Sequence, residues 1–175
     1  MTEHPQGPEG LIPGLRVAPV QTVSQERLVA SSPLEVEQRL AAGPRFDAVR
    51  RPGLLRVTGY PTPTAASGAG LAVGSRWTFT VAGDPIETEV VERAAGRLVF
   101  KVVRDESKTR RWLTWQGGTV SWHAQGASTA VRIEIPFIRR LDPSWYFGPI
   151  ESAMVGAGLD HFTDALGLVD DADGH

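Results

Sequence analysis

The sequence predicts an α+β domain in which a curved, seven-stranded antiparallel sheet wraps around one long C-terminal helix. Two short helices are expected between the first and second strands. The main evidence is a series of segments between residues 77 and 137 in which apolar and polar residues alternate, as they do along a strand with one buried face. Turn residues separate these segments at hairpin spacing. After them, between residues 150 and 168, apolar residues recur at helical spacing.

The beginning of the chain predicts one strand and one capped helix. Residues 20–30 are rich in Val, Thr and Leu, which indicates a strand. Ser32 and Glu35 have the spacing of a capping box, and Pro33 suits the first helical turn. We therefore expect a helix from Pro33 to about Ala42, ended by the glycine that follows.

The stretch between this helix and the alternating segments is less regular. Residues 44–50 predict a second, short turn of helix, and residues 54–58 predict a short strand. Residues 60–74 are rich in proline and glycine, so we expect a long connecting loop of the kind that often forms a lid or a binding loop. Its glycines do not make a phosphate-binding loop, because the third glycine and the following lysine are missing and a strand comes next.

The turns between the alternating segments predict how neighbouring strands pair. Gly83-Asp84 suits a two-residue hairpin loop, residues 94–96 a three-residue loop with glycine last, and Gly126-Ala127 another two-residue loop. All three registers place the apolar residues on the same face of the sheet, which a slip of one residue would prevent. The predicted pairs are Val81 with Ile86, Phe79 with Thr88, Trp77 with Val90, Glu92 with Leu98, Val90 with Phe100, Thr88 with Val102, Trp122 with Val131, and Val120 with Ile133.

Residues 105–118 leave two interpretations open. The stretch could begin the strand that ends at Ala124, with Gly117-Gly118 as a bulge. It could equally be a separate loop that carries Trp112 and Trp115. Arginines beside these tryptophans suggest a stacking surface for nucleic acid, but without a wider basic surface a lid or packing role is favoured.

The end of the chain predicts the long helix. Asp142 suits the N-cap and Pro143 the first helical position. Pro149 is expected to interrupt the helix and kink it, and Gly167 to end it. Glu151, Ser152, Asp160 and Thr163 are expected largely outside the centre of the apolar face. That face contains Met154, Val155, Gly158, Leu159, Phe162, Ala165 and Leu166.

Composition and charge narrow the class of protein. The length of 175 residues predicts one domain over residues 15–168, preceded by a disordered leader at 1–14 and followed by a solvated tail at 169–175. A formal net charge of −2 gives no reason to expect nucleic acid, and no stretch is apolar for long enough to span a membrane. The absence of cysteine excludes disulfides and fits a cytoplasmic protein.

The order of these elements resembles the helix-grip fold of the START-like superfamily, also called SRPBCC, over residues 20–168. The stretch from Ser31 to Val36 resembles the family's step from first strand to first helix, and the stretch from Gly74 to Trp77 its entry to the third strand. Residues 139–149 resemble the final helix entry of a bacterial subgroup, and the superfamily includes bacterial polyketide cyclase/dehydrase-like proteins. The resemblance implies this fold and a cavity. It implies no catalytic residue, because the family shares no catalytic motif.

Such a cavity lies between the concave face of the sheet and the inner face of the last helix. The alternative is that the same residues fill a solid core, each contributing about 1.5–3 kcal/mol when buried. Gly158 is small for a core position and favours a pocket that is left open. The expected wall consists of Trp77, Phe79, Val90, Phe100, Val102, Trp122, Val131, Ile133 and Ile135, facing Met154, Gly158 and Phe162.

Candidate catalytic and metal-binding groups are few. No histidine has a partner at metal-ligand spacing, so neither a metal site nor a cofactor is expected. His161 and Asp164 are expected at one edge of the apolar face, where they could line the pocket mouth. Glu92 and Arg104 fall on the inward phase near strand ends, where they could hold a polar group of a ligand. The catalytic residues, if any, are unknown.

Three functions are compatible with these observations. The leading one is binding of a small hydrophobic molecule, lipid-like or polyketide-like, by a monomer or homodimer. The second is a cyclase or dehydratase acting on a polyketide-like substrate, which inward-facing acids, bases or amides would favour. The third is an interaction module with a solid core and a docking patch around Trp112, Trp115 or Trp145.

Overall fold

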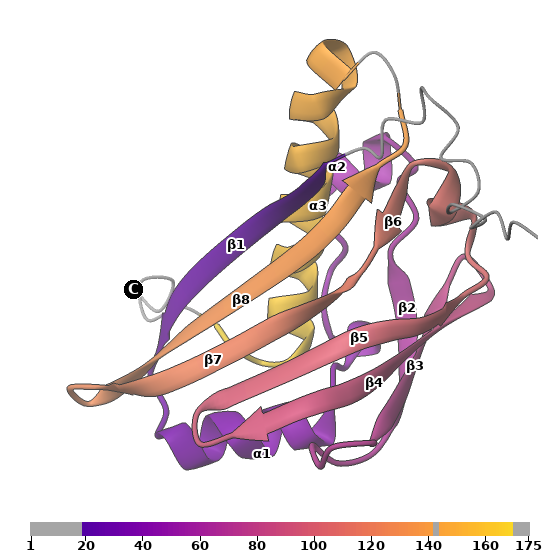
Figure 1. Ribbon diagram of the computed structural model, residues 1–175. Helices are drawn as coiled ribbons and strands as arrows, with labels where there is room; N and C mark the ends of the chain where they lie inside the picture. The colour runs from indigo at the N-terminus through magenta and orange to yellow at the C-terminus, as the bar shows by residue number, and fades with distance from the viewer. Residues whose placement is uncertain (1–18, 142–143, 170–175) are drawn as a thin grey trace, which may run out of the picture.

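A single antiparallel sheet dominates the computed structural model, which describes residues 19–141 and 144–169 (Figure 1). Its strands are β1 Val20–Val29, β2 Pro63–Gly68, β3 Arg76–Val81, β4 Asp84–Ala94, β5 Arg97–Asp105, β6 Leu113–Trp115, β7 Gly117–Gln125 and β8 Ser128–Arg139. Seven of them form a continuous path in the order β1-β8-β7-β5-β4-β3-β2, and the short β6 pairs with β8 beside this path.

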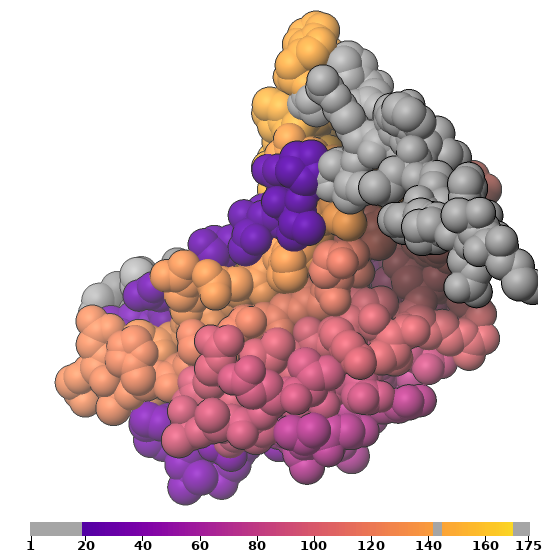
Figure 2. Space-filling model, in the orientation of Figure 1, coloured from indigo at the N-terminus to yellow at the C-terminus, as the bar shows by residue number. Residues whose placement is uncertain are grey.

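The helices lie on the concave side and at the ends of the sheet. They are α1 Pro33–Ala42, the 3-10 turn η1 Phe46–Ala48, α2 Gly53–Val57, the 3-10 turn η2 Lys108–Arg111, and α3 Ser144–Ala165. The sheet curls around α3, while α1 closes the lower end of the curve in Figure 1. The first turns of α3 project beyond the sheet, as the space-filling view also shows (Figure 2). This arrangement confirms the predicted fold class.

Helix α1 forms as its capping box predicts. The Ser32 hydroxyl accepts a hydrogen bond from the Glu35 backbone N–H at 3.3 Å, and the Glu35 carboxylate accepts one from the Ser32 N–H at 2.7 Å. Gly43 ends the helix with a φ of +79°, and a side chain there would overlap the Trp77 ring. The helix end and the third strand can therefore approach closely.

The second strand is not where the sequence indicated. Residues 54–58, expected as a strand, belong largely to helix α2, and only Leu55 in α2 is buried. Strand β2 lies instead within residues 60–74, which were expected to be a loop, and pairs with β3 at the edge of the sheet. An edge strand tolerates Pro63 as its first residue and shows little apolar alternation, because one of its sides has no neighbouring strand.

The first hairpin register is shifted from the prediction. The pairs are Val81 with Asp84, Phe79 with Ile86 and Trp77 with Thr88. The loop consists of Ala82 and Gly83, whose φ angles of 52° and 89° suit a tight hairpin turn with two left-handed residues. Because the shift is two residues, every side chain stays on its predicted face. The predicted pairing of Trp77 with Val90 is wrong.

The other two registers follow the sequence more closely. Val90 pairs with Phe100 and Thr88 with Val102, as predicted, but a bulge after Val90 pairs Glu92 with Val99 instead of Leu98. Glu92 consequently lies exposed at the surface, in an ion pair with Arg97. In the last hairpin, both predicted pairs are confirmed: Trp122 with Val131, and Val120 with Ile133.

Residues 105–118 combine features of both interpretations. After the turn η2, β6 pairs with β8, so that Trp115 lies opposite Phe137, and β7 begins separately at Gly117. The close approach of β5 requires glycine at this start, because a side chain on Gly117 would overlap the backbone of Phe100. Trp112 is partly exposed, whereas Trp115 packs inward.

Helix α3 is continuous from Ser144 to Ala165, so the expected interruption at Pro149 is wrong. The predicted cap residue Asp142 and Pro143 lie outside the described residues. At the other end, the Gly167 N–H donates to Asp164 O at 2.9 Å and the Leu168 N–H to Thr163 O at 3.1 Å. With Gly167 at a φ of +70°, these bonds form a Schellman motif, and the helix ends at the glycine that the sequence indicated.

Candidate ligand-binding site

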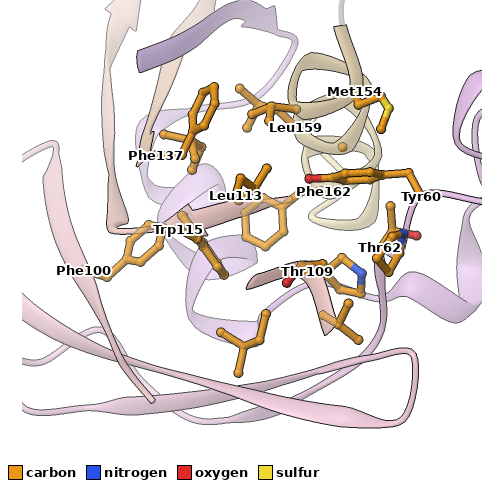
Figure 3. A pocket seen from close by; sticks show the side chains of 17 residues that line it. Tyr60, Thr62, Phe100, Thr109, Leu113, Trp115, Phe137, Met154, Leu159 and Phe162 are labelled. Atoms are coloured by element: carbon orange, nitrogen blue, oxygen red, sulfur yellow. The ribbon is translucent and has the colours of Figure 1, made fainter. Parts of the chain in front are cut away.

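A cavity of about 130 Å³ lies between α3 and the part of the sheet near β6 (Figure 3). Its walls come from the α2–β2 connection, the sheet, η2 and α3, and are almost entirely apolar. The residues around it are Tyr60, Pro61, Thr62, Pro63, Val81, Ile86, Phe100, Thr109, Leu113, Trp115, Ile135, Phe137, Met154, Val155, Gly158, Leu159 and Phe162.

Aromatic rings packed edge to face form one wall. The Trp115 ring lies 6.1 Å from Phe79 and 6.0 Å from Phe100, at angles of 62° and 80°. Its indole N–H donates to the Gly117 carbonyl, so the remaining ring surface is apolar. Phe162 of α3 continues this wall, 5.9 Å from Phe79. These rings hold one another in place. Trp115, Phe100 and Phe162 line the cavity and offer a preformed surface to a flat molecule, whereas Phe79 supports them without lining it.

The cavity remains open where α3 passes because Gly158 has no side chain. A Cβ atom built there meets no heavy atom within 4 Å outside its own helical neighbourhood. The glycine is not needed for a close approach of two backbones or for an unusual backbone angle. The sequence-based inference that Gly158 leaves room is therefore consistent with the packing.

Three hydroxyl groups are the polar members of the lining: those of Tyr60, Thr62 and Thr109, all in residues that are buried. Tyr60 is only 7% exposed. Burial raises the pKa of its phenol well above the ordinary value, and the negative charge of Glu151 raises it further. The Tyr60 hydroxyl therefore keeps its proton at neutral pH and can act as a hydrogen-bond donor.

Glu151 is one charged group next to this site, and the expectation that it would lie away from the apolar face is wrong. It is 1% exposed, and the Arg139 Nε atom lies 3.6 Å from its carboxylate. Arg139 also donates to the Ser152 hydroxyl at 2.8 Å. Its guanidinium occupies the space where Gly148 has no side chain. The positive charge of Arg139, at the end of β8, therefore balances the buried carboxylate of Glu151 in α3.

His161 does not line the cavity mouth, contrary to expectation. It is 3% exposed and packs against Phe46 with ring centroids 5.6 Å apart. Burial lowers the pKa of His161; Asp164 opposes this shift and Arg51 adds to it. The imidazole is therefore neutral at neutral pH. Its burial has a structural explanation, because it fills space between α3 and η1.

Asp164 belongs to a polar cluster that joins β1 to α3. Arg27 donates to Asp164 at 2.6 Å and to Asp160 at 3.2 Å, and its guanidinium also reaches Leu168 O at 3.0 Å. Thr163, expected outside the apolar face, is buried and donates to Leu159 O at 2.6 Å. The cluster fixes the side of α3 that faces away from the cavity.

The predicted wall residues are divided among four environments. Phe100, Ile135, Met154, Gly158 and Phe162 surround the cavity. Trp77, Phe79 and Val90 line a second, smaller space of about 50 Å³ near Gly43, to which Phe100 and Phe162 also contribute. Val131, Ile133 and Trp122 are packed in the core, and Val102 packs against a neighbouring cluster.

Several lining residues were absent from the predicted wall. Phe137, Val81 and Ile86 continue inward alternations from which the pattern could have identified them. Val155 and Leu159 were expected on the apolar face of the last helix but not in the wall. Tyr60 and Thr62 lie in the stretch expected to be a loop. Part of the stretch 60–74, which was expected to be a loop of the kind that often forms a lid or a binding loop, lies beside the cavity. Arg104, the other proposed polar contact, is exposed and pairs with Glu87 and Glu106.

Exposed apolar side chains lie on the first turns of α3. Trp145 is 79% exposed, and Tyr146 and Ile150 are also exposed on the projecting turns of α3.

Among residues 19–141 and 144–169, no helix is both long and apolar enough to cross a membrane. The same described ranges contain no group of three or more side chains suited to a metal ion.

Comparisons with known proteins identify the fold. No protein-family model and no curated protein sequence matches the chain. A START superfamily protein from Mycobacterium smegmatis matches with a TM-score of 0.58 and 17% identity, over 83% of this chain and 93% of that chain. A protein of Rhizobium leguminosarum matches with a TM-score of 0.53 and 16% identity, over 86% and 96%.

An enzyme structure has the same architecture. Norcoclaurine synthase from Thalictrum flavum, in complex with dopamine and hydroxybenzaldehyde, matches with a TM-score of 0.53 and 11% identity, over 94% of this chain and 95% of that chain. At such identities the likeness concerns the fold alone. The chain has the helix-grip fold of the START-like superfamily.

Proposed function

We propose that the protein binds a small, neutral, hydrophobic molecule in the cavity beside Gly158. The observation that carries the proposal is the open space at Gly158, on the face of α3 that borders the apolar cavity. A solid core would place a side chain there, because glycine in a helix interior costs about 0.5–1 kcal/mol relative to alanine. Binding of a ligand in the cavity would offset this cost.

The size of the cavity indicates the size of the molecule. At about 130 Å³ it is close to an engineered apolar cavity of about 150 Å³ that binds benzene. Sites for drug-sized ligands are larger, about 300–1,000 Å³. A compound with one ring fits the cavity as it stands, whereas a longer polyketide-like molecule requires the walls to move apart.

The chemistry of the lining supports binding over catalysis. Its side chains are apolar except for three hydroxyls, and its described members include no acid, base or amide. A cyclase or dehydratase needs groups that move protons at the substrate. Dopamine and hydroxybenzaldehyde, which are bound in the norcoclaurine synthase structure, are single-ring molecules of the proposed size class.

Calorimetric titration with benzene and toluene tests the proposal, with Gly158→Leu as the blocked variant. We expect saturable binding of one molecule per chain to the parent protein and loss of binding in Gly158→Leu. Gly156→Leu is the matched control, because Gly156 lies on the same helix, has equally open space, and does not line the cavity. Absence of binding in the parent, or equal binding in Gly158→Leu, would refute the proposal.

A further inference from the structure

The Tyr60 hydroxyl is a polar group placed inside an apolar cavity. Figure 3 shows the Tyr60 ring extending from the α2–β2 connection across the cavity, so that its oxygen points inward, toward the α3 side. The residue is 93% buried, as its exposed fraction of 7% implies, yet the hydroxyl makes no hydrogen bond to any described residue. The hydroxyl faces the cavity, so the only partner it can find there is a molecule that occupies the cavity. A hydrogen-bond donor in an otherwise apolar lining favours an occupant that carries an acceptor.

Thr109 cannot supply the same function, because its proton is already used. The Asp105 carboxylate accepts from the Ser107 hydroxyl at 2.7 Å, which commits the Ser107 proton. The Thr109 hydroxyl contacts the Ser107 oxygen and must be the donor of that pair. Only its oxygen lone pairs remain available toward the cavity. Tyr60 and Thr62 are then the hydroxyls that can donate to an occupant.

The electrostatic surroundings select a neutral acceptor. Burial and the Glu151 carboxylate raise the pKa of Tyr60, which keeps the phenol protonated and able to donate. The apolar walls would leave an anionic ligand poorly solvated. A carbonyl oxygen accepts a hydrogen bond without carrying a net charge, and its ring or chain can contact the aromatic wall.

We propose that the cavity is specific for a small cyclic molecule bearing one carbonyl oxygen, which accepts a hydrogen bond from the Tyr60 hydroxyl. This inference rests on the proposed function and adds the chemical class of the ligand. Tyr60 donates, the ring of the ligand fills the space beside Gly158, and the walls of Phe137 and Leu159 contact its apolar edge.

The experiment compares two ligands of nearly the same shape, cyclohexanone and methylenecyclohexane, which differ by an oxygen in place of a CH₂ group. Their dissociation constants are measured by calorimetry for the parent protein and for Tyr60→Phe. The variant should lose about 3- to 10-fold in affinity for the ketone, the range expected of one hydrogen bond. Its affinity for the hydrocarbon should stay within about twofold, since the phenylalanine ring keeps the wall.

The chain supplies its own control. Tyr146 is its other tyrosine, and it is exposed on the first turns of α3. Tyr146→Phe should leave both dissociation constants unchanged. Because Tyr60→Phe removes a hydroxyl with no partner among the described residues, its melting temperature should equal or exceed that of the parent, which shows that the variant is folded.

The outcomes separate the two claims. If both ligands bind and Tyr60→Phe weakens them equally or not at all, the assignment of Tyr60 as a carbonyl donor is wrong, while the proposed function stands. If neither ligand binds the parent protein saturably, the proposed function and this inference are both wrong. A selective loss of ketone affinity in Tyr60→Phe, absent in Tyr146→Phe, supports both.

Discussion

Replacing Gly158 with leucine measures whether the space beside α3 is hollow. The substitution removes the helix penalty of glycine, worth about 0.6–1 kcal/mol. It also buries a leucine side chain in the cavity, where full burial contributes about 1.5–3 kcal/mol. Strain from an imperfect fit subtracts part of this gain. Since no atom lies within 4 Å of the new Cβ, we expect a net stabilisation of about 1–3 kcal/mol.

The assay is urea unfolding followed by tryptophan fluorescence, with Gly156→Leu as reference. Gly156 shares the helix and has open space around it, so its substitution reports the helix propensity without filling the cavity. Gly158→Leu should exceed it in stability, and its melting temperature should rise by about 2–4 °C per kcal/mol. If Gly158→Leu is instead less stable than Gly156→Leu by about 1–3 kcal/mol, the site is overpacked and the cavity does not exist in solution.

Three further perturbations test other parts of the structure. Because burial lowers the pKa of His161, this residue is protonated in the unfolded state before the folded state as the pH falls through 6.5, so the free energy of unfolding should decrease there. In His161→Gln the difference between the urea midpoints at pH 7.5 and 5.5 should be smaller than in the parent protein, and an equal difference would contradict this prediction. Ser32→Ala should lower the free energy of unfolding by about 1 kcal/mol through loss of the α1 cap, and an unaltered thermal melt would count against the capping box. Gly148→Ala should be less stable than Gly156→Ala by about 1 kcal/mol, because its methyl group displaces the Arg139 guanidinium from its place near Glu151. Equal effects of the two substitutions would show that Arg139 does not need this space.

Local patterns were sufficient for most of the fold. Alternation along β5, β7 and β8 identified strands and faces, because each has one buried side and a neighbour on both edges. The capping box at Ser32 and the glycine at 167 gave correct helix ends, since both signals act within one helical turn. The sequence does not reveal strand β2, because Ala65 and Ala66 are small and give no clear alternation of apolar and polar residues at this sheet edge.

The site was only partly predictable, because its polar features depend on contacts between distant segments. Glu151 looks like a surface residue by helical spacing, and its burial depends on Arg139 from another element. His161 is buried by Phe46, more than a hundred residues earlier. Tyr60 turns inward from a stretch whose sequence indicated only a loop. By contrast, Gly158 and Phe162 were identified correctly, since their place on α3 follows from the helical period alone.

The most direct test of ligand binding in this cavity observes Met154, which lines it. The chain has two methionines, and the other is Met1, so labelling methionine methyl groups with ¹³C gives at most two signals. During titration with toluene, the Met154 methyl signal should shift saturably, with ring-current changes from the bound aromatic molecule, and should not respond in Gly158→Leu. A Met154 signal that stays unchanged at saturating toluene would contradict the existence of a binding cavity between α3 and the sheet.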